Sequence, residues 1–228
     1  TLRECHERAV AGVENFFLEE DTIVDVHDLF RIIRDRIAIR VLELVEREML
    51  DEDLGKPPTD YVWAGLGSEG RDEQTMVTDQ DNLLVYAERS DDFASGELRK
   101  RCVKMMTHGA SPAPPGDLDP KTLLDGYFRI FAEKASERLH QVGFEKCKGG
   151  VMPVNDRWRG SITDWKKRID ERITFSRGIF EPLDVIILTD ARRVNGNDAI
   201  LRELLDYFFA QLTNNKHFMK EFIQSAVL

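Results

Sequence analysis

The chain has 228 residues, of which 42% are hydrophobic, so it is long enough to form one large domain or two small ones with a proper core. Its formal net charge of −10 argues against a general nucleic-acid-binding surface. No apolar run approaches the roughly 18 residues that a membrane-spanning helix needs, so no membrane association is expected.

A helical segment is predicted over residues 1–55. Apolar side chains recur there at the three- and four-residue spacing of one helix face, as in Leu29, Ile33, Ile37, Val41 and Leu44. The glycine and prolines of residues 55–58 would end this segment. Because the chain begins at Thr1 within one helical pattern and ends within another, we expect it to be part of a longer protein. Its three widely spaced cysteines fit neither a disulfide framework nor a zinc signature and predict a reducing, cytoplasmic location.

A strand from Tyr61 to Ala64 is predicted to run into a glycine-rich turn. In that turn, Gly67 and Gly70 permit positive φ angles and a close approach of the backbone. Successive N–H groups in such a turn, or at the start of a helix near Ser68, can bind phosphate oxygens. Ser68 adds a hydroxyl donor and Arg71 a planar cation suited to phosphate. Taken alone, such a turn is more typical of an ordinary connection between strands.

A second strand is predicted to open with Asp79 and Asp81. Residues i and i+2 of a strand point to the same face about 7 Å apart, so the two carboxylates would project together while Gln80 points away. Two such charges repel by roughly 2 kcal/mol at an effective dielectric near 20. A divalent cation between them turns this repulsion into attraction, as Mg²⁺ does at phosphoryl-transfer sites. The pair next to the glycine turn therefore indicates a site for metal and phosphate.

The rest of the chain predicts mainly helices. They are expected at residues 96–106, at 123–141, from a capping box at 161–164 to about 175, and after a turn at 195–198, with a loop at 111–120 and a last strand at 183–189. We expect an α/β (α+β) fold in which a small mixed sheet is flanked by helices. The predicted division is an N-terminal helical segment at 1–55, a core with helical insertions at 56–200, and the start of a truncated C-terminal helical region at 201–228.

The residues Gly67-Ser68-x-Gly70-Arg71 and Thr78-Asp79-x-Asp81-Asn82 resemble the motifs of the nucleotidyltransferase superfamily that includes DNA polymerase beta. They look most like the branch found in bacterial signalling proteins beside CBS and cyclic-nucleotide-binding domains, which is related to the N-terminal part of protein-PII uridylyltransferase. Two later stretches, 143–165 and 188–196, resemble the same branch, so the similarity covers most of the chain in the expected order.

The resemblance implies a third metal-site carboxylate on a later strand, and Asp190 is the position that matches. The alternative role for Asp190, apart from the resemblance, is a strand-terminal cap or a partner of Arg192. Asp79, Asp81 and Asp190 would then bind two Mg²⁺ ions, while Gly67, Ser68, Gly70 and Arg71 would hold the triphosphate, with Glu73 orienting Arg71. The uridylyltransferase relatives begin this turn with two glycines, whereas this chain has Gly67-Ser68.

The resemblance therefore implies a magnesium-dependent enzyme, uridylyl- or adenylyltransferase-like, that moves a nucleoside monophosphate from a nucleoside triphosphate to a protein or small acceptor. It also implies flanking regulatory domains in the full-length protein. Two alternatives stay open at this point. One is a catalytically silent module that senses nucleotide within a larger signalling protein, and the other is a purely structural interaction domain.

Overall fold

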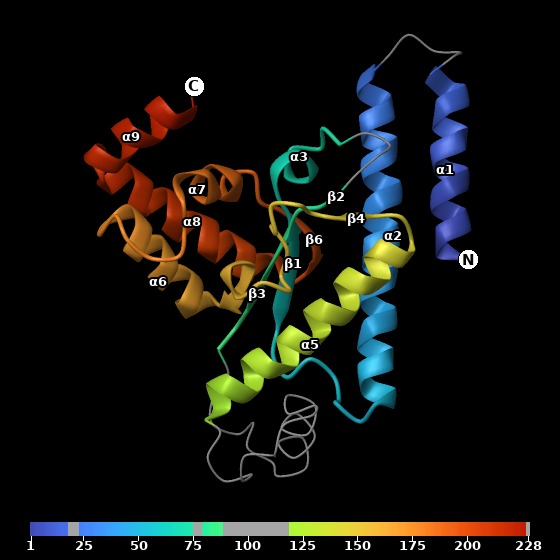
Figure 1. Cartoon of the computed structure of the whole chain (residues 1–228), viewed down its shortest axis with the longest axis horizontal. Coiled ribbons are helices and arrows are strands. Elements are labelled where there is room, and N and C mark those ends of the chain that lie inside the picture. The colour runs from blue at the N-terminus through green and yellow to red at the C-terminus, as the bar shows by residue number, and fades with distance from the viewer. Residues whose placement is uncertain (18–22, 75–78, 89–118, 227–228) are drawn as a thin grey trace.

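The computed structural model describes residues 1–17, 23–74, 79–88 and 119–226. Two N-terminal helices, α1 (Leu2–Phe17) and the long α2 (Ile23–Asp51), lie side by side (Figure 1). They confirm the predicted helical character of the N-terminal region. The expected helix at 96–106 and all but the last two residues of the expected loop at 111–120 fall outside the described residues.

The centre of the protein is a mixed four-stranded sheet in the order β5-β3-β1-β6. Its strands are β1 (Tyr61–Gly65), β3 (Asn82–Tyr86), β5 (Arg159–Ser161) and β6 (Arg192–Gly196). Strand β1 is antiparallel to β3 and β6, whereas β3 and β5 are parallel. The structure thus confirms the predicted small mixed sheet with flanking helices.

Alternate residues of the central strands face two separate apolar layers. Trp63 and Leu84 pack with α2 and α5 (Pro120–Gln141) on one face. Val62 and Val85 pack on the other face with α6 (Ile162–Ile173) and α8 (Asp198–Asn214). Figure 1 shows α5 crossing α2 on one side of the strands and α6 and α8 on the other. Because both faces are covered, β1 and β3 are buried along their whole length.

Helix boundaries follow from local capping. Asp119 accepts a hydrogen bond from the Thr122 N–H at 2.9 Å and starts α5, with Pro120 at the first helical position. The predicted capping box at Ser161 and Asp164 is present and starts α6. Asn197 caps α8 by accepting from the Ala199 N–H at 3.0 Å. The predicted helices at 123–141 and after 161 and 195–198 are confirmed.

The predicted strand at 183–189 is wrong, because the segment forms helix α7 (Pro182–Leu188). Pro182 supplies a helical φ at the first position, and the Glu181 N–H donates to the Asp184 carboxylate at 2.8 Å, which closes the first turn. A run of four apolar residues does not distinguish a strand from a short helix. Asp190 consequently lies in the turn between α7 and β6 and does not end a strand.

The remaining elements are short, apart from the terminal helix α9 (Lys216–Ala226). They are α3 (Gly67–Gly70), the 3-10 helix η2 (Asp156–Trp158), and the parallel pair β2 (Asp79–Gln80) and β4 (Glu145–Lys146). Within the described part of the chain, no helix has both the length and the apolar character needed to cross a membrane.

Candidate functional site

The structure brings Asp79 and Asp81 together, but they do not share the single strand that was predicted: Asp79 begins β2, and Asp81 lies in the break between β2 and β3. Their carboxylates supply ligand atoms within 4.8 Å of each other. The intervening Gln80 points into the core, where its amide donates to the backbone carbonyls of Ser136 at 3.1 Å and Phe144 at 2.9 Å. The Ser136 hydroxyl donates back to the Gln80 side-chain oxygen at 2.8 Å. This buried anchor fixes the strand so that both aspartates face away from α5.

Cys147 is the third member of this group, and it was not predicted from the sequence. Strands β2 and β4 pair in parallel, with Asp79 opposite Glu145 and Gln80 opposite Lys146. The same register continued by one residue places Cys147 beside Asp81. Its sulfur lies within 4.8 Å of ligand atoms of both aspartates and hydrogen-bonds with the Asp81 carboxylate. A separation of 66 residues between Asp81 and Cys147 offers no spacing motif by which the sequence could have revealed the contact.

The surroundings of the group shift the pKa of two of its members, Asp81 and Cys147. Burial raises the pKa of Asp81; the hydrogen bond from Cys147 opposes this, and the charge of Asp79 adds to it. Burial likewise raises the pKa of the Cys147 thiol, as does its hydrogen bond to Asp81. An added cation would stabilise the charged forms of all three groups. The chemistry of the two carboxylates fits Mg²⁺, which prefers oxygen ligands.

The predicted phosphate-binding turn lies directly against Asp81. The Leu66 N–H donates to the Asp81 carbonyl at 2.8 Å, and a Cβ on Gly67 would lie 3.5 Å from the Asp81 carboxylate. Gly67 has a φ of +53°, a conformation that favours glycine. A helix start near Ser68 was predicted, and the structure has the short helix α3, which begins at Gly67. The turn and the aspartates therefore form one continuous surface.

Arg71 and Asp190, to which the sequence analysis gave separate roles, contact each other. The Arg71 guanidinium pairs with the Asp190 carboxylate and, through Nε, donates to Glu73 at 2.9 Å. The predicted contact between Arg71 and Glu73 is therefore present. Among the described residues, Asp190 is not part of the close group formed by Asp79, Asp81 and Cys147. Its role as a third metal ligand stays a prediction.

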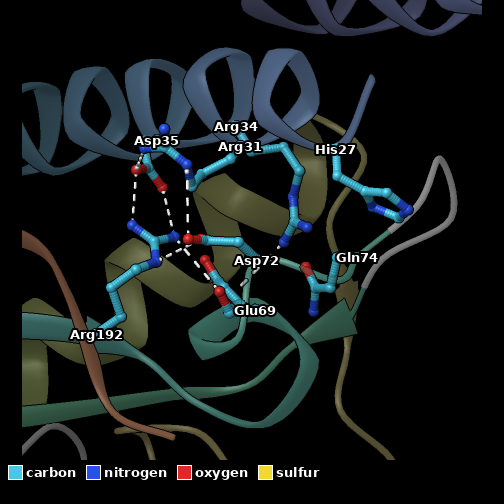
Figure 2. Close-up of a pocket in the computed structure, with 8 residues that line it drawn as sticks. All are labelled: His27, Arg31, Arg34, Asp35, Glu69, Asp72, Gln74 and Arg192. Atoms are coloured by element: carbon cyan, nitrogen blue, oxygen red, sulfur yellow. Dashed lines mark hydrogen bonds and ion pairs between the residues drawn. The ribbon is translucent and has the colours of Figure 1, made fainter. Parts of the chain in front are cut away.

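A charged stripe on α2, consisting of Arg31, Arg34 and Asp35, contacts the glycine-rich turn and its neighbours (Figure 2). Arg192 donates to Asp35 at 2.8 and 3.0 Å, and Arg31 lies 3.6 Å from Asp72. Together with His27, Glu69 and Gln74, these residues line a small pocket. The pocket has room for about one water molecule, which is too little for a nucleotide. The ion pairs of the charged stripe thus hold the turn in position. They were not predicted from the sequence.

Glu69 links this stripe to the sheet. Its buried carboxylate accepts from the Asn82 side chain at 3.0 Å and lies 3.8 Å from the Arg34 guanidinium. Burial raises the pKa of Glu69 to about 7, although the charges of Arg34 and Arg192 oppose the shift. Glu69 follows Ser68 directly, so its buried contacts fix the position of the predicted phosphate-binding turn.

Comparison with known proteins identifies a family for this chain. A family model described as "Putative nucleotidyltransferase DUF294" matches residues 7–112 and 117–177 of the chain. The matched ranges include the glycine turn, both aspartates and Cys147. No curated protein matches the chain.

Proposed function

Because the chain belongs to the DUF294 family of nucleotidyltransferases, we propose that it transfers a nucleoside monophosphate from a nucleoside triphosphate to a protein or small acceptor in a Mg²⁺-dependent reaction. The observation that supports this best is the close pairing of Asp79 and Asp81 beside the Gly67-Ser68 turn. We further propose a cytoplasmic role in bacterial signalling, with uridylyl- or adenylyl-transfer similar to that of protein-PII uridylyltransferase and with flanking regulatory domains.

In this proposal Asp79 and Asp81 hold the metal, with Asp190 as a third carboxylate of a two-metal site. Bound Mg²⁺ would supply charge neutralisation on the triphosphate and a lower pKa for the attacking hydroxyl. Asp190 would have to leave Arg71 to reach such a site, since the two side chains are paired. That exchange would free Arg71 for the nucleotide at the same time.

The glycine turn would bind the triphosphate. The backbone N–H groups of Gly67 and Ser68 and the Ser68 hydroxyl are suitable donors, and Gly67 leaves space beside Asp81. Arg71 is 46% exposed, so its guanidinium is accessible to the β- and γ-phosphates. The acceptor oxygen would attack the α-phosphorus while the bond to the bridging oxygen breaks. Pyrophosphate then leaves, and the hydroxyl proton passes to solvent.

A direct assay tests this function. The protein would be incubated with each of the four ribonucleoside triphosphates, with and without Mg²⁺, and released pyrophosphate would be measured with candidate protein acceptors present. We expect Mg²⁺-dependent release with one preferred base and loss of release in Asp81→Asn. Binding of nucleotide without any release, under all these conditions, would contradict the enzymatic proposal.

The second candidate is a nucleotide-sensing module without catalysis. It is favoured by one observation: Asp190, the predicted third carboxylate, is paired with the Arg71 guanidinium and is only 15% exposed. In that case nucleotide would bind and change the flanking regulatory regions, but no pyrophosphate would form. The same assay, combined with calorimetric titration of nucleotide, separates the two functions.

A further inference from the structure

Three potential metal-ligand atoms converge at the edge of the β2–β4 pair. Asp79, Asp81 and Cys147 each offer one atom, and all three atoms lie within 4.8 Å of one another. A tetrahedral Zn²⁺ site with Zn–S and Zn–O bonds near 2.3 and 2.1 Å needs separations of roughly 3.6 Å between ligand atoms. The three atoms would therefore have to approach by at most roughly 1.2 Å, which side-chain rotation can supply. All three residues are partly exposed, so an ion can reach them from solvent.

The chain also holds the Cys147 sulfur in place. Backbone N–H groups of Gly149 and Val151 donate toward it, and the Gly150 N–H closes the turn onto the Cys147 carbonyl at 3.1 Å. Gly150 has a φ of +70°, which permits the tight turn, and the backbone N–H of Asn82 anchors this turn to β3 by donating to the Val151 carbonyl at 2.9 Å. Amide donors of this kind stabilise a thiolate, which is the metal-binding form of cysteine.

From this geometry we propose that Cys147 is a third protein ligand of the cation site at Asp79 and Asp81, and that it makes the site selective for thiophilic divalent ions such as Zn²⁺. The proposal rests on the assignment of the two aspartates as metal ligands in the proposed function. Carboxylates alone suit Mg²⁺, whereas a thiolate among the ligands favours Zn²⁺ and Co²⁺. Three protein ligands leave a fourth position open to water or to a phosphate oxygen.

Metal binding at this site exchanges one proton for the ion. The Cys147 sulfur lies within 4.8 Å of ligand atoms of both aspartates, so an ion bound there also meets the thiol. Binding of Zn²⁺ breaks the S–H bond, releases the thiol proton to solvent and forms the Zn–S bond, with no change in oxidation state. Zn²⁺ would then compete with Mg²⁺ for Asp79 and Asp81, so trace zinc would control the activity of the proposed transferase.

Co²⁺ alone, without nucleotide, is the probe for the first test. A thiolate ligand gives Co²⁺ a sulfur-to-metal charge-transfer absorption in the near ultraviolet, and Zn²⁺ should abolish it by displacement. We expect the band in the wild type and in the matched controls Cys5→Ser and Cys102→Ser, and its loss in Cys147→Ser. We also expect Cys147→Ser to weaken Zn²⁺ binding at least about tenfold, the lower end of the losses found even for outer-sphere partners. A band that persists in Cys147→Ser, or Co²⁺ binding without a band in the wild type, would overturn the proposal.

A second measurement uses the wild type only, so it does not depend on folding of a variant. The rate of Cys147 alkylation by iodoacetamide would be followed by mass spectrometry of the peptide, with exposed Cys5 as the internal control. Zn²⁺ should slow alkylation of Cys147 at least about tenfold and leave Cys5 unaffected. Equal rates with and without Zn²⁺ contradict the proposal even if pyrophosphate release is found. Protection of Cys147 from alkylation without any pyrophosphate release would instead contradict the proposed enzymatic function and support Cys147 as a Zn²⁺ ligand.

Discussion

Gly70 lies so close to Asp190 that a Cβ on residue 70 would meet the Asp190 carbonyl oxygen at 1.9 Å. This contact joins the end of α3 to the turn that follows α7, 120 positions later in the chain. The neighbouring residue Arg71 pairs with the side chain of the same aspartate. The backbone contact therefore determines how near the predicted phosphate-binding turn lies to the predicted third carboxylate.

Gly70→Ala should destabilise the protein by about 1–3 kcal/mol, because the added methyl group meets a backbone atom that cannot turn away. It should also weaken nucleoside triphosphate binding, since Asp190 and the turn would be forced apart. Urea unfolding and calorimetric titration measure the two effects. Gly12→Ala is the matched control, because a Cβ there meets nothing within 4 Å and should stabilise α1 by about 0.5–1 kcal/mol. Wild-type stability in Gly70→Ala would show that the contact is not tight.

Asp81→Asn should abolish Mg²⁺-dependent pyrophosphate release without lowering the melting temperature of the metal-free protein. Burial raises the pKa of Asp81, so its ionised form is disfavoured in the fold, and removing the charge should leave stability unchanged or slightly higher at neutral pH. Differential scanning calorimetry and the pyrophosphate assay check both parts. The control is Asp206→Asn on the exposed face of α8. A melting temperature lowered by several degrees in Asp81→Asn would mean that Asp81 is a structural residue.

Arg71→Lys should weaken triphosphate binding more than monophosphate binding. The lysine ammonium cannot reproduce the planar two-pronged contact, and the monophosphate lacks the β- and γ-groups that Arg71 would meet. We expect a loss of roughly 1.5 kcal/mol for the triphosphate, or about tenfold in Kd. Arg202→Lys, an exposed arginine paired with Asp198 at 3.0 Å, should change neither affinity. Calorimetric titrations that give equal affinities for the wild type, Arg71→Lys and Arg202→Lys would show that Arg71 does not bind the phosphates.

Glu69→Gln should remove a pH dependence of stability. The pKa of Glu69 is raised to about 7 in the fold, so the folded state keeps a proton between pH 4.5 and 7 that the unfolded state has lost. In this window the free energy of unfolding of the wild type should fall as the pH rises. In Glu69→Gln the slope of this free energy against pH should lack the contribution of one bound proton. Urea unfolding at intervals from pH 4.5 to 8 measures it. The exposed Glu203→Gln should keep the wild-type slope, and an unchanged slope in Glu69→Gln would place the titration elsewhere.

The sequence predicted the parts of the site that depend on local chemistry. The spacing of Asp79 and Asp81 was enough to predict that they lie together, although the single strand expected there is divided into β2 and β3. The glycines were enough to predict the turn beside them. Local signals also predicted the capping box of α6 and the turn before α8. The prediction at α7 was wrong because the apolar run alone was taken to indicate a strand. Pro182, and Glu181 and Asp184 at the spacing of a capping box, favoured a helix.

Long-range contacts were beyond sequence reasoning. Cys147 reaches Asp81 only through the pairing of two two-residue strands, and such short strands carry no readable periodicity. The side chains of Arg34 and Asp35 likewise looked like ordinary helix charges. Their partners, Glu69 and Arg192, are distant in the chain, and only the folded structure brings them into contact.

The charged stripe on α2 makes the site sensitive to the rotational phase of that helix. Arg31, Arg34 and Asp35 are three and four positions apart, so they share one face, and their partners belong to the segments that carry Ser68, Arg71 and Asp190. A single residue inserted between Arg31 and Arg34 would rotate Arg31 by about 100° around the helix axis relative to Arg34 and Asp35. The helix would keep its length and its propensity, yet it could no longer hold all three segments at once.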